Sequence, residues 1–226
     1  MKTSLEISVS LDPVSGKEDF KDYIKWLNTV QGISIHLDVM DGAFVPRMSC
    51  TPEEFDFVVT NSVHPIDVHL MIENPERDLD KYLSGIGRQR DGQGIRSISF
   101  HVETQPSEVT LSQLKKIRRA GIMPGIIVDL PTILSLDCRD TCGILGKSDV
   151  VTVMSVKCGA SGQSFNQDAL DKIRMIKEIN PMARVIVDGG VKMENIAMVE
   201  KAGADIAVMG SAVYSNRLIL KQLLDK

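Results

Sequence analysis

Eight short runs rich in Val and Ile recur about every 25 to 35 residues, and this recurrence constrains the fold more than any other feature of the chain. Runs that are apolar almost throughout are typical of strands buried on both faces of a parallel sheet. Segments with helical spacing separate the runs, and several of these segments end in glycine, as helices often do. The eight runs are LEISVS (5–10), ISIHLDV (33–39), IDVHLM (66–71), IRSISFHV (95–102), GIIVDL (125–130), DVVTVMSV (149–156), RVIVDGG (184–190) and DIAVMG (205–210).

Eight strand-then-helix units predict an α/β fold, a (β/α)8 TIM barrel formed by residues 1–226 as a single domain. The length of 226 residues, 43% of them hydrophobic, is sufficient for such a core. A doubly wound open sheet is the alternative, and the even spacing of the units favours the closed barrel. The polar, glycine-rich stretch GIGRQRDGQG (85–94) predicts a mobile loop before the fourth strand.

The net charge and the hydropathy of the chain argue against several classes of partner. A net charge of −4 gives no reason to expect binding to nucleic acid or to an anionic membrane. No apolar stretch reaches the roughly 18 residues of a membrane span, and MKTSLEISVSLDP lacks the apolar core of a signal peptide. We therefore expect a cytoplasmic protein that acts on a small molecule. The four cysteines lack CxxC spacing, which favours structural roles.

Four potential metal ligands lie at the ends of three of the predicted strands: His36, Asp38, His69 and Asp188. The C-terminal ends of the strands in a barrel of this kind meet at one mouth, so these side chains are expected to be neighbours. Two imidazoles and two carboxylates form a suitable shell for a divalent metal. Two aspartates at one mouth also suit a reaction that removes a proton from one face of a substrate and returns it on the other.

The other two histidines carry weaker signals. His64 precedes Pro65 where a strand begins, away from the expected mouth, and is interpreted as a core residue. His101 ends the fourth strand and is placed to line the site, but the sequence indicates no partner for it.

Glycine-bearing turns follow the last three strands, in CGASGQSF (158–165), DGG (188–190) and MGSA (209–212). Glycine lets backbone N–H groups approach an anion closely, and the turns after the seventh and eighth strands of such barrels commonly hold phosphate. A phosphate site is therefore predicted. Met40, Met71 and Met154 each end a different strand, which indicates either core packing or an apolar wall around a reactive carbon.

Several segments together resemble the ribulose-phosphate 3-epimerase family. HLDVMDGAFVPRM is similar to the family's His-x-Asp-Val-Met-Asp-Gly-His-Phe-Val-Pro signature, and further blocks follow in the family's order over nearly the whole chain. The resemblance implies a barrel of the ribulose-phosphate-binding type and epimerisation at C3 of D-ribulose 5-phosphate to D-xylulose 5-phosphate through a cis-enediolate. It also implies a homo-oligomer and a place in the pentose phosphate pathway. The further blocks are DVHLMIENPE, TVMSVKCGASGQSF and VDGGV…AGADIAVMGSA.

The resemblance also assigns roles to residues. His36, Asp38, His69 and Asp188 would hold one divalent ion, with zinc expected first and iron, manganese or cobalt as alternatives. Asp38 and Asp188 would double as the acid–base pair, and the ion would stabilise the enediolate as a Lewis acid. The substrate would be contacted by Ser10, His69 and the three methionines, and its phosphate by the backbone of Gly159, Ala160, Ser161, Gly162, Gly189, Gly190, Gly210 and Ser211.

Departures from the family pattern lie in the loops that face the substrate. The metal-ligand positions are intact, so these changes keep two alternatives open: a 3-epimerase of a related ketose phosphate such as D-allulose 6-phosphate, and a sugar-phosphate-binding barrel without catalysis. Decarboxylase chemistry of the orotidine-phosphate type would need an Asp-x-Lys-x-x-Asp run, and LDVMDG has no lysine. The departures are Ile7 for Ser, Ala43 for His, Arg47-Met48 for Asn-Leu, Lys157-Cys158 for Glu-Pro, Ala160-Ser161 for Phe-Gly, and DLPT (129–132) for Asn-Pro-x-Thr.

Overall fold

The computed structural model of the chain describes residues 5–83, 94–134 and 139–224. The mobile loop predicted for residues 85–94 falls outside these ranges except for its last residue, Gly94. A single domain that extends over all of residues 1–226 stays a prediction, because the described residues stop short of both ends. The strands are β1 (Glu6–Ser10), β2 (Ile33–Asp41), β3 (Met48–Ser49), β4 (Pro65–Met71), β5 (Gly94–His101), β6 (Met123–Val128), β7 (Val150–Met154), β8 (Arg184–Asp188) and β9 (Ile206–Met209).

Eight of these strands form a closed parallel barrel. Each pairs in parallel with its neighbours in the order β1-β9-β8-β7-β6-β5-β4-β2, and β1 also pairs with β2, which closes the ring. The closed TIM barrel predicted from the sequence is confirmed, and the open doubly wound sheet is excluded. The two-residue strand β3 was not predicted. It runs antiparallel to the end of β2, with Met40 opposite Ser49, and is too short to show a pattern of its own.

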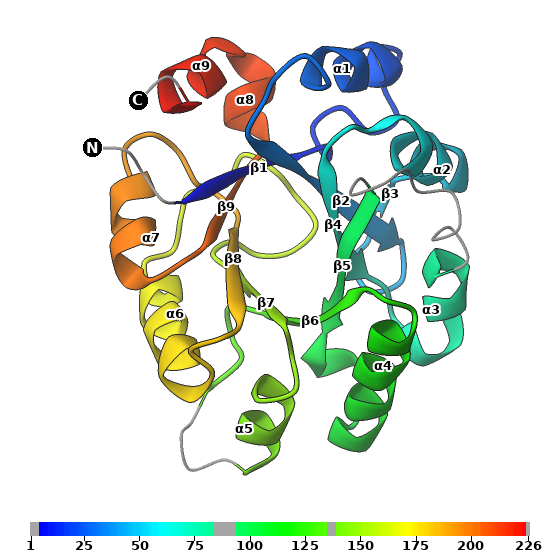
Figure 1. Cartoon of the computed structure of the whole chain (residues 1–226), viewed down its shortest axis with the longest axis vertical. Helices are drawn as coiled ribbons and strands as arrows, with labels where there is room; N and C mark the ends of the chain where they lie inside the picture. The colour runs from blue at the N-terminus through cyan, green and yellow to red at the C-terminus, as the bar shows by residue number, and fades with distance from the viewer. Residues whose placement is uncertain (1–4, 84–93, 135–138, 225–226) are drawn as a thin grey trace.

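Helices surround the barrel, so the strands lie at the centre of the view in Figure 1. They also give the strands their second buried face, which explains why the strand sequences are apolar almost throughout. A short 3-10 turn, η2 (Val102–Thr104), follows β5. The helices are α1 (Phe20–Leu27), α2 (Pro52–Asn61), α3 (Pro75–Leu83), α4 (Ser107–Arg119), α5 (Arg139–Leu145), α6 (Asp168–Ile179), α7 (Ile196–Ala202), α8 (Ser211–Ser215) and α9 (Leu218–Leu224).

Local sequence explains where individual helices begin and end. Helix α2 starts with a capping box, in which the Thr51 side chain accepts from the Glu54 backbone N–H and the Glu54 side chain accepts from the Thr51 N–H. Pro52 occupies the first helical turn, where its missing N–H costs nothing. Helix α7 ends at Ala202 and is capped by Gly203, whose φ of 103° lies in the left-handed region that favours glycine. No helix in the described ranges is long and apolar enough to cross a membrane.

The main core lies between the strands and the surrounding helices, and a smaller cluster fills the barrel itself. Apolar side chains of β7, β8 and β9 form that inner cluster, from Val150, Ile186, Ile206 and Val208. Layers of this kind make the inside of the barrel a packed core and leave the ends of the strands as its functional surfaces.

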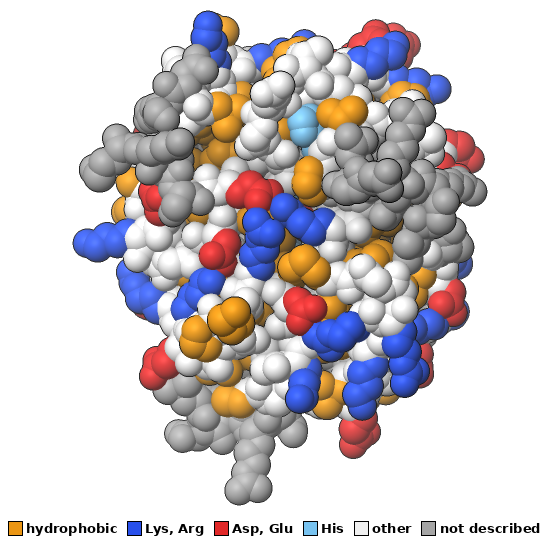
Figure 2. Space-filling model, in the orientation of Figure 1, with side chains coloured by type: hydrophobic (Ala, Val, Ile, Leu, Met, Phe, Trp, Pro, Cys, Tyr) orange, Lys and Arg blue, Asp and Glu red, His pale blue; other side chains and the backbone are white. Residues whose placement is uncertain are grey.

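The end of the barrel where the strands begin carries a network of ion pairs. Arg96 donates to Glu6 at 2.8 Å (Nη1 to Oε1) and to Asp67 at 3.0 Å (Nε to Oδ1). Arg184 binds the other oxygen of Glu6 at 2.7 Å. Side chains of both charges gather near the centre of the face shown in Figure 2. Each acid of the network therefore has an arginine partner at this end.

Candidate active site

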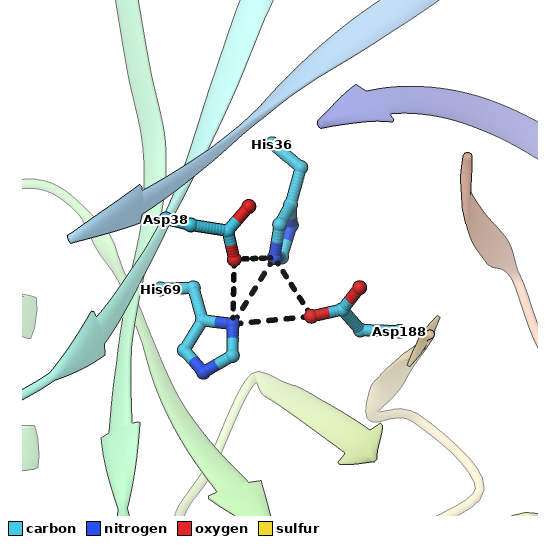
Figure 3. Close-up of side chains that lie close together, drawn as sticks. All are labelled: His36, Asp38, His69 and Asp188. Carbon is cyan, nitrogen blue, oxygen red and sulfur yellow. Dashed lines mark hydrogen bonds and ion pairs between the residues drawn. The ribbon is translucent and has the colours of Figure 1, made fainter. Parts of the chain in front are cut away.

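The register of the parallel strands brings the predicted ligands together. Strands β2 and β4 pair so that Asp38 lies beside His69, and β1 and β2 pair Ser10 with His36. Asp188 is the last residue of β8, which two strands, β1 and β9, separate from β2 around the ring. The four side chains His36, Asp38, His69 and Asp188 converge inside the mouth of the barrel (Figure 3).

The four converging groups lie close together, with one potential ligand atom of each within 4.8 Å of the others. Asp38 Oδ1 lies 3.5 Å from His36 Nε2 and 3.2 Å from His69 Nδ1. Asp188 Oδ2 lies 3.4 Å from the same nitrogen of His36 and 3.2 Å from that of His69. The two nitrogens are themselves 3.2 Å apart. Both histidines are almost fully buried, with 1% exposure, so the cluster is shielded from water.

Mutual attraction sets the charge of these groups. Burial would lower the pKa values of His36 and His69, but Asp38 and Asp188 outweigh it and raise them. Burial would likewise raise the pKa values of the two aspartates, but the two histidines outweigh it and lower them. The ionised state of the two carboxylates and the positive charge of the two histidines therefore depend on one another.

A divalent cation fits this donor set better than protons do. If protons balanced the charge, both imidazoles would carry N–H groups on nitrogens only 3.2 Å apart that face one another. A divalent ion supplies the same charge and lets both nitrogens present lone pairs. Ligands about 2.0–2.1 Å from a tetrahedral zinc ion lie roughly 3.3–3.4 Å apart. The five distances given above run from 3.2 to 3.5 Å.

The two aspartates differ in the hydrogen bonds made by the carboxylate oxygen that does not face the histidines. Ser10 donates its hydroxyl to Asp38 Oδ2 at 2.7 Å, and the Ser10 hydroxyl in turn accepts from the Asp12 backbone N–H at 3.1 Å. Within the described part of the chain, no comparable donor binds the second oxygen of Asp188. The structure thus anchors Asp38 and leaves one oxygen of Asp188 available.

Most of the predicted substrate-binding residues line one pocket above the four-residue cluster. His36 and His69 are not among the residues that line the pocket, so a direct contact between His69 and substrate stays a prediction. Lys157 and Lys192 were not predicted, and both line the same pocket. The predicted residues in the wall are Ser10, Asp38, Met40, Met71, Met154, Gly159, Ala160, Ser161, Gly162, Asp188, Gly189, Gly190, Gly210 and Ser211.

Glycine is required at two positions of this wall. Gly189 and Gly190 have φ angles of 110° and 62°, in the region that disfavours other residues. A Cβ atom at Gly189 would lie 2.3 Å from a methyl group of Val156, and one at Gly190 would lie 2.6 Å from the Phe165 backbone nitrogen. Close backbone packing therefore shapes the turn after β8.

The three methionines form an apolar part of the pocket wall. The strand registers place Met40 beside Met71, and Met154 beside Asp188. All three are buried, with exposures of 4%, 2% and 3% for Met40, Met71 and Met154. The positions of the three methionines are compatible with core packing and with an apolar pocket wall, because each packs against its neighbours and also lines the pocket.

The contacts of two side chains near the site, His101 and Arg47, were not predicted from the sequence. His101 has the partner that the sequence did not indicate, since its Nε2 lies 3.1 Å from His69 Nε2. Arg47 Nη1 pairs with the buried Asp12 at 2.7 Å and lies 3.5 Å from the Gly159 carbonyl, which links three loops of the mouth. Burial lowers the pKa of His101, which keeps its ring neutral.

Of the residues interpreted as structural, His64 and Cys50 are buried as expected, whereas Cys158 is not confined to a structural position. His64 is buried, and its Nε2 lies 2.9 Å from the Leu27 carbonyl at the opposite end of the barrel from the mouth. Cys50 is buried, and burial raises the pKa of its thiol. Cys158 lies in the pocket wall, where its Sγ is 3.8 Å from His101 Nε2. Cys138 lies outside the described residues.

Comparison with known proteins places the chain within one family. The profile described as the Ribulose-phosphate 3 epimerase family matches residues 6–214. A ribulose-phosphate 3-epimerase of Aquifex aeolicus is 36% identical over 192 residues, which cover 83% of this chain and 80% of that protein. The enzyme of the same name from Serratia marcescens is 35% identical and covers 81% and 83%. The one from Helicobacter pylori is 31% identical and covers 88% of each.

Solved structures are similar in fold. A tryptophan synthase complex from Pyrococcus furiosus contains a chain that superposes with a TM-score of 0.68 at 18% identity, over 100% of this chain and 99% of that one. At this identity the likeness bears on the barrel alone, since one such fold supports many chemistries.

Proposed function

The chain belongs to the ribulose-phosphate 3-epimerase family, and we propose that it interconverts D-ribulose 5-phosphate and D-xylulose 5-phosphate by epimerisation at C3. The observation that carries this proposal is the pairing of two buried, ionised aspartates, Asp38 and Asp188, on opposite sides of two imidazoles at the mouth of the barrel. A site that only binds sugar phosphate has no need of two such acids.

The two aspartates act as the acid–base pair. One carboxylate removes the C3 proton from one face of the sugar, and the other delivers a proton to the opposite face. The hydroxyl of Ser10 holds Asp38 in position at 2.7 Å. Because the second oxygen of Asp188 has no such partner in the described structure, it is the more basic site and takes part directly in proton transfer.

One divalent ion completes the site, held by His36, Asp38, His69 and Asp188. Zinc is the ion that we propose first, because two imidazoles and two carboxylates at these spacings suit it; iron, manganese and cobalt share this chemistry. When bound, the ion supplies a Lewis acid that stabilises the negative charge developing on the substrate oxygens. The histidines contribute neutral donors, and the aspartates contribute the balancing charge.

The glycine turns and two lysines hold the phosphate. Residues 159–162, 189–190 and 210–211 line the pocket, and we propose that their backbone N–H groups bind the phosphate, which glycine permits to approach closely. Lys157 and Lys192 add positive charge beside the first two of these turns. Met40, Met71 and Met154 form an apolar part of the pocket wall that excludes water, which strengthens electrostatic interactions within the site. We further propose a homo-oligomer that works in the cytoplasm, in the pentose phosphate pathway.

Steady-state kinetics with two substrates test this function. Purified protein is assayed with D-ribulose 5-phosphate and with D-allulose 6-phosphate, in parallel and with equal zinc loading. A higher kcat/KM for ribulose 5-phosphate supports the proposal. A higher value for allulose 6-phosphate assigns the protein to the related ketose phosphate. Zinc-loaded protein that binds both sugars and turns over neither would be a non-catalytic binder.

A further inference from the structure

His69 has a second neighbour that lies on the side away from the four-residue cluster. Its Nδ1 faces Asp38 and Asp188, while its Nε2 lies 3.1 Å from Nε2 of His101. His101 is the last residue of β5 and is fully buried, at 0% exposure. A buried contact between two imidazole nitrogens requires one of them to carry a proton and the other a lone pair.

The position of that proton follows from the cluster. A metal ligand must offer a lone pair, so the His69 Nδ1 that faces the cluster carries no proton. The neutral His69 ring then has its proton on Nε2, which donates to His101 Nε2. Consequently the His101 proton resides on its other nitrogen, Nδ1. The two rings thus form a hydrogen-bonded pair in which His69 is the donor and His101 is the acceptor.

Glu103 completes this order. Its Oε2 lies 3.4 Å from His101 Nδ1, an ion-pair distance at which the carboxylate attracts the remaining proton, although the pair does not have hydrogen-bond geometry. Its Oε1 accepts from the Asp129 backbone N–H at 3.1 Å and from the Thr132 hydroxyl. Burial would raise the pKa of Glu103, but the His101 and Thr132 side chains outweigh it and lower that pKa. An ionised, anchored carboxylate therefore ends the series Glu103–His101–His69.

Packing fixes the middle ring of the series. The Phe44 ring lies against His101, with ring centroids 4.5 Å apart, and the His69 ring is also adjacent to His101, with centroids 5.3 Å apart. The equivalent nitrogen of His36, Nδ1, is buried and has no hydrogen-bond partner in the described structure. Of the two imidazoles that face the aspartates, His69 is therefore the one whose far nitrogen is held by a neighbouring side chain, that of His101.

We propose that His101 and Glu103 are positioning residues of the metal centre, which together hold the His69 ring so that its Nδ1 lone pair points at the ion. This inference rests on the metal site in the proposed function. Partners of this kind fix the tautomer of a ligating histidine, and their loss typically weakens metal binding about 10- to 100-fold. Neither residue needs to touch the substrate in order to act in this way.

The test measures the zinc dissociation constant by competition with a chromophoric chelator, in metal-free protein reloaded with Zn²⁺. H101F keeps an aromatic ring against Phe44 and removes both nitrogens, so we expect zinc to bind about 10- to 100-fold more weakly. H101Q offers an amide oxygen to His69 and an amide N–H to Glu103, and it is expected to bind zinc more tightly than H101F. H64Q, which alters a buried histidine at the other end of the barrel, is the matched control and should bind zinc like wild type.

The outcomes separate the possibilities. Wild-type zinc affinity in H101F, or equal losses in H101F and H101Q, would overturn the inference. If H101F does not fold by circular dichroism, E103Q decides the matter, since it leaves the ring in place: weaker zinc binding supports the series and unchanged binding contradicts it. Wild-type protein that binds no zinc would overturn the metal site and this inference together. Wild-type protein that binds zinc without epimerising would overturn only the proposed reaction.

Discussion

The two ends of the barrel handle buried charge in opposite ways. Where the strands begin, Arg96 and Arg184 pair with Glu6 and Asp67, so acids and bases balance within the protein. Where the strands end, Asp38 and Asp188 face two imidazoles whose nearest nitrogens are 3.2 Å apart. The first arrangement is complete as it stands, whereas the second calls for an added cation. The comparison teaches that charge at one end serves folding and charge at the other serves chemistry.

The largest expected effect comes from Asp188→Asn at the mouth. The amide keeps the shape and one oxygen donor but cannot accept a proton, so kcat should fall by about 10²- to 10⁴-fold. The unfolding midpoint should stay near that of wild type. Kinetics, zinc analysis and thermal unfolding on the same sample check this. Near-native turnover would remove Asp188 from the acid–base pair.

His69→Ala should chiefly remove metal. One of four donors is lost, and the loss of affinity should exceed the roughly 100-fold upper end that is typical for a residue behind a ligand. Elemental analysis of the purified variant is expected to show a lower zinc content per chain than wild type. An unchanged stoichiometry would contradict the place of His69 among the ligands.

Arg96→Met tests the other end of the barrel. It leaves the buried Asp67, whose side chain is 3% exposed, without its arginine, and breaking such a pair costs about 3–5 kcal/mol of unfolding free energy. Urea denaturation should show this loss, while kcat of the folded enzyme stays at the wild-type value. A loss of kcat with unchanged stability would contradict the claim that the charges at this end of the barrel serve folding.

Lys157→Ala and Lys192→Ala should have smaller effects, confined to substrate binding. Each exposed ammonium contributes about 0.4–1 kcal/mol to holding a phosphate, which corresponds to a KM increase of roughly 2- to 5-fold with little change in kcat. The increase should shrink at high ionic strength, because salt screens such pairs. Measuring KM at two salt concentrations checks this, and KM values equal to wild type at low salt would exclude the lysines from the phosphate site.

The smallest expected effect is that of Ser161→Gly. Residue 161 is exposed in the pocket wall, and the proposed phosphate contact there is through the backbone. The variant should retain wild-type KM and kcat. A large rise in KM would show that the hydroxyl itself binds substrate.

Much of the fold could be predicted because the barrel repeats one simple pattern. Each of the eight strands is an apolar run that the sequence displays directly, and the repeating order of strand and helix implies closure. Strand β3 was not predicted because a strand of two residues is too short to show a periodic pattern. The contact between Arg47 and Asp12 joins two loops, and no repeating pattern governs loop conformation.

The candidate site could be predicted only in part, for a related reason. Strand ends indicate which residues face the mouth, so His36, Asp38, His69 and Asp188 were identified together. Which of them touch depends on register, such as the pairing of Asp38 with His69, and the sequence does not display register. The contact of His101 with His69 likewise depends on how β5 aligns with β4, together with two side-chain orientations.

Exchange of the C3 proton with solvent tests the central claim most directly. Zinc-loaded protein is incubated in D₂O with D-ribulose 5-phosphate, with and without a chelator, and the C3 proton signal is followed by NMR. The two-aspartate account predicts deuterium at C3 together with the appearance of xylulose 5-phosphate, and loss of both when the chelator has removed the metal. Retention of the C3 proton by zinc-loaded protein, or exchange that persists at full rate after metal removal, would contradict it.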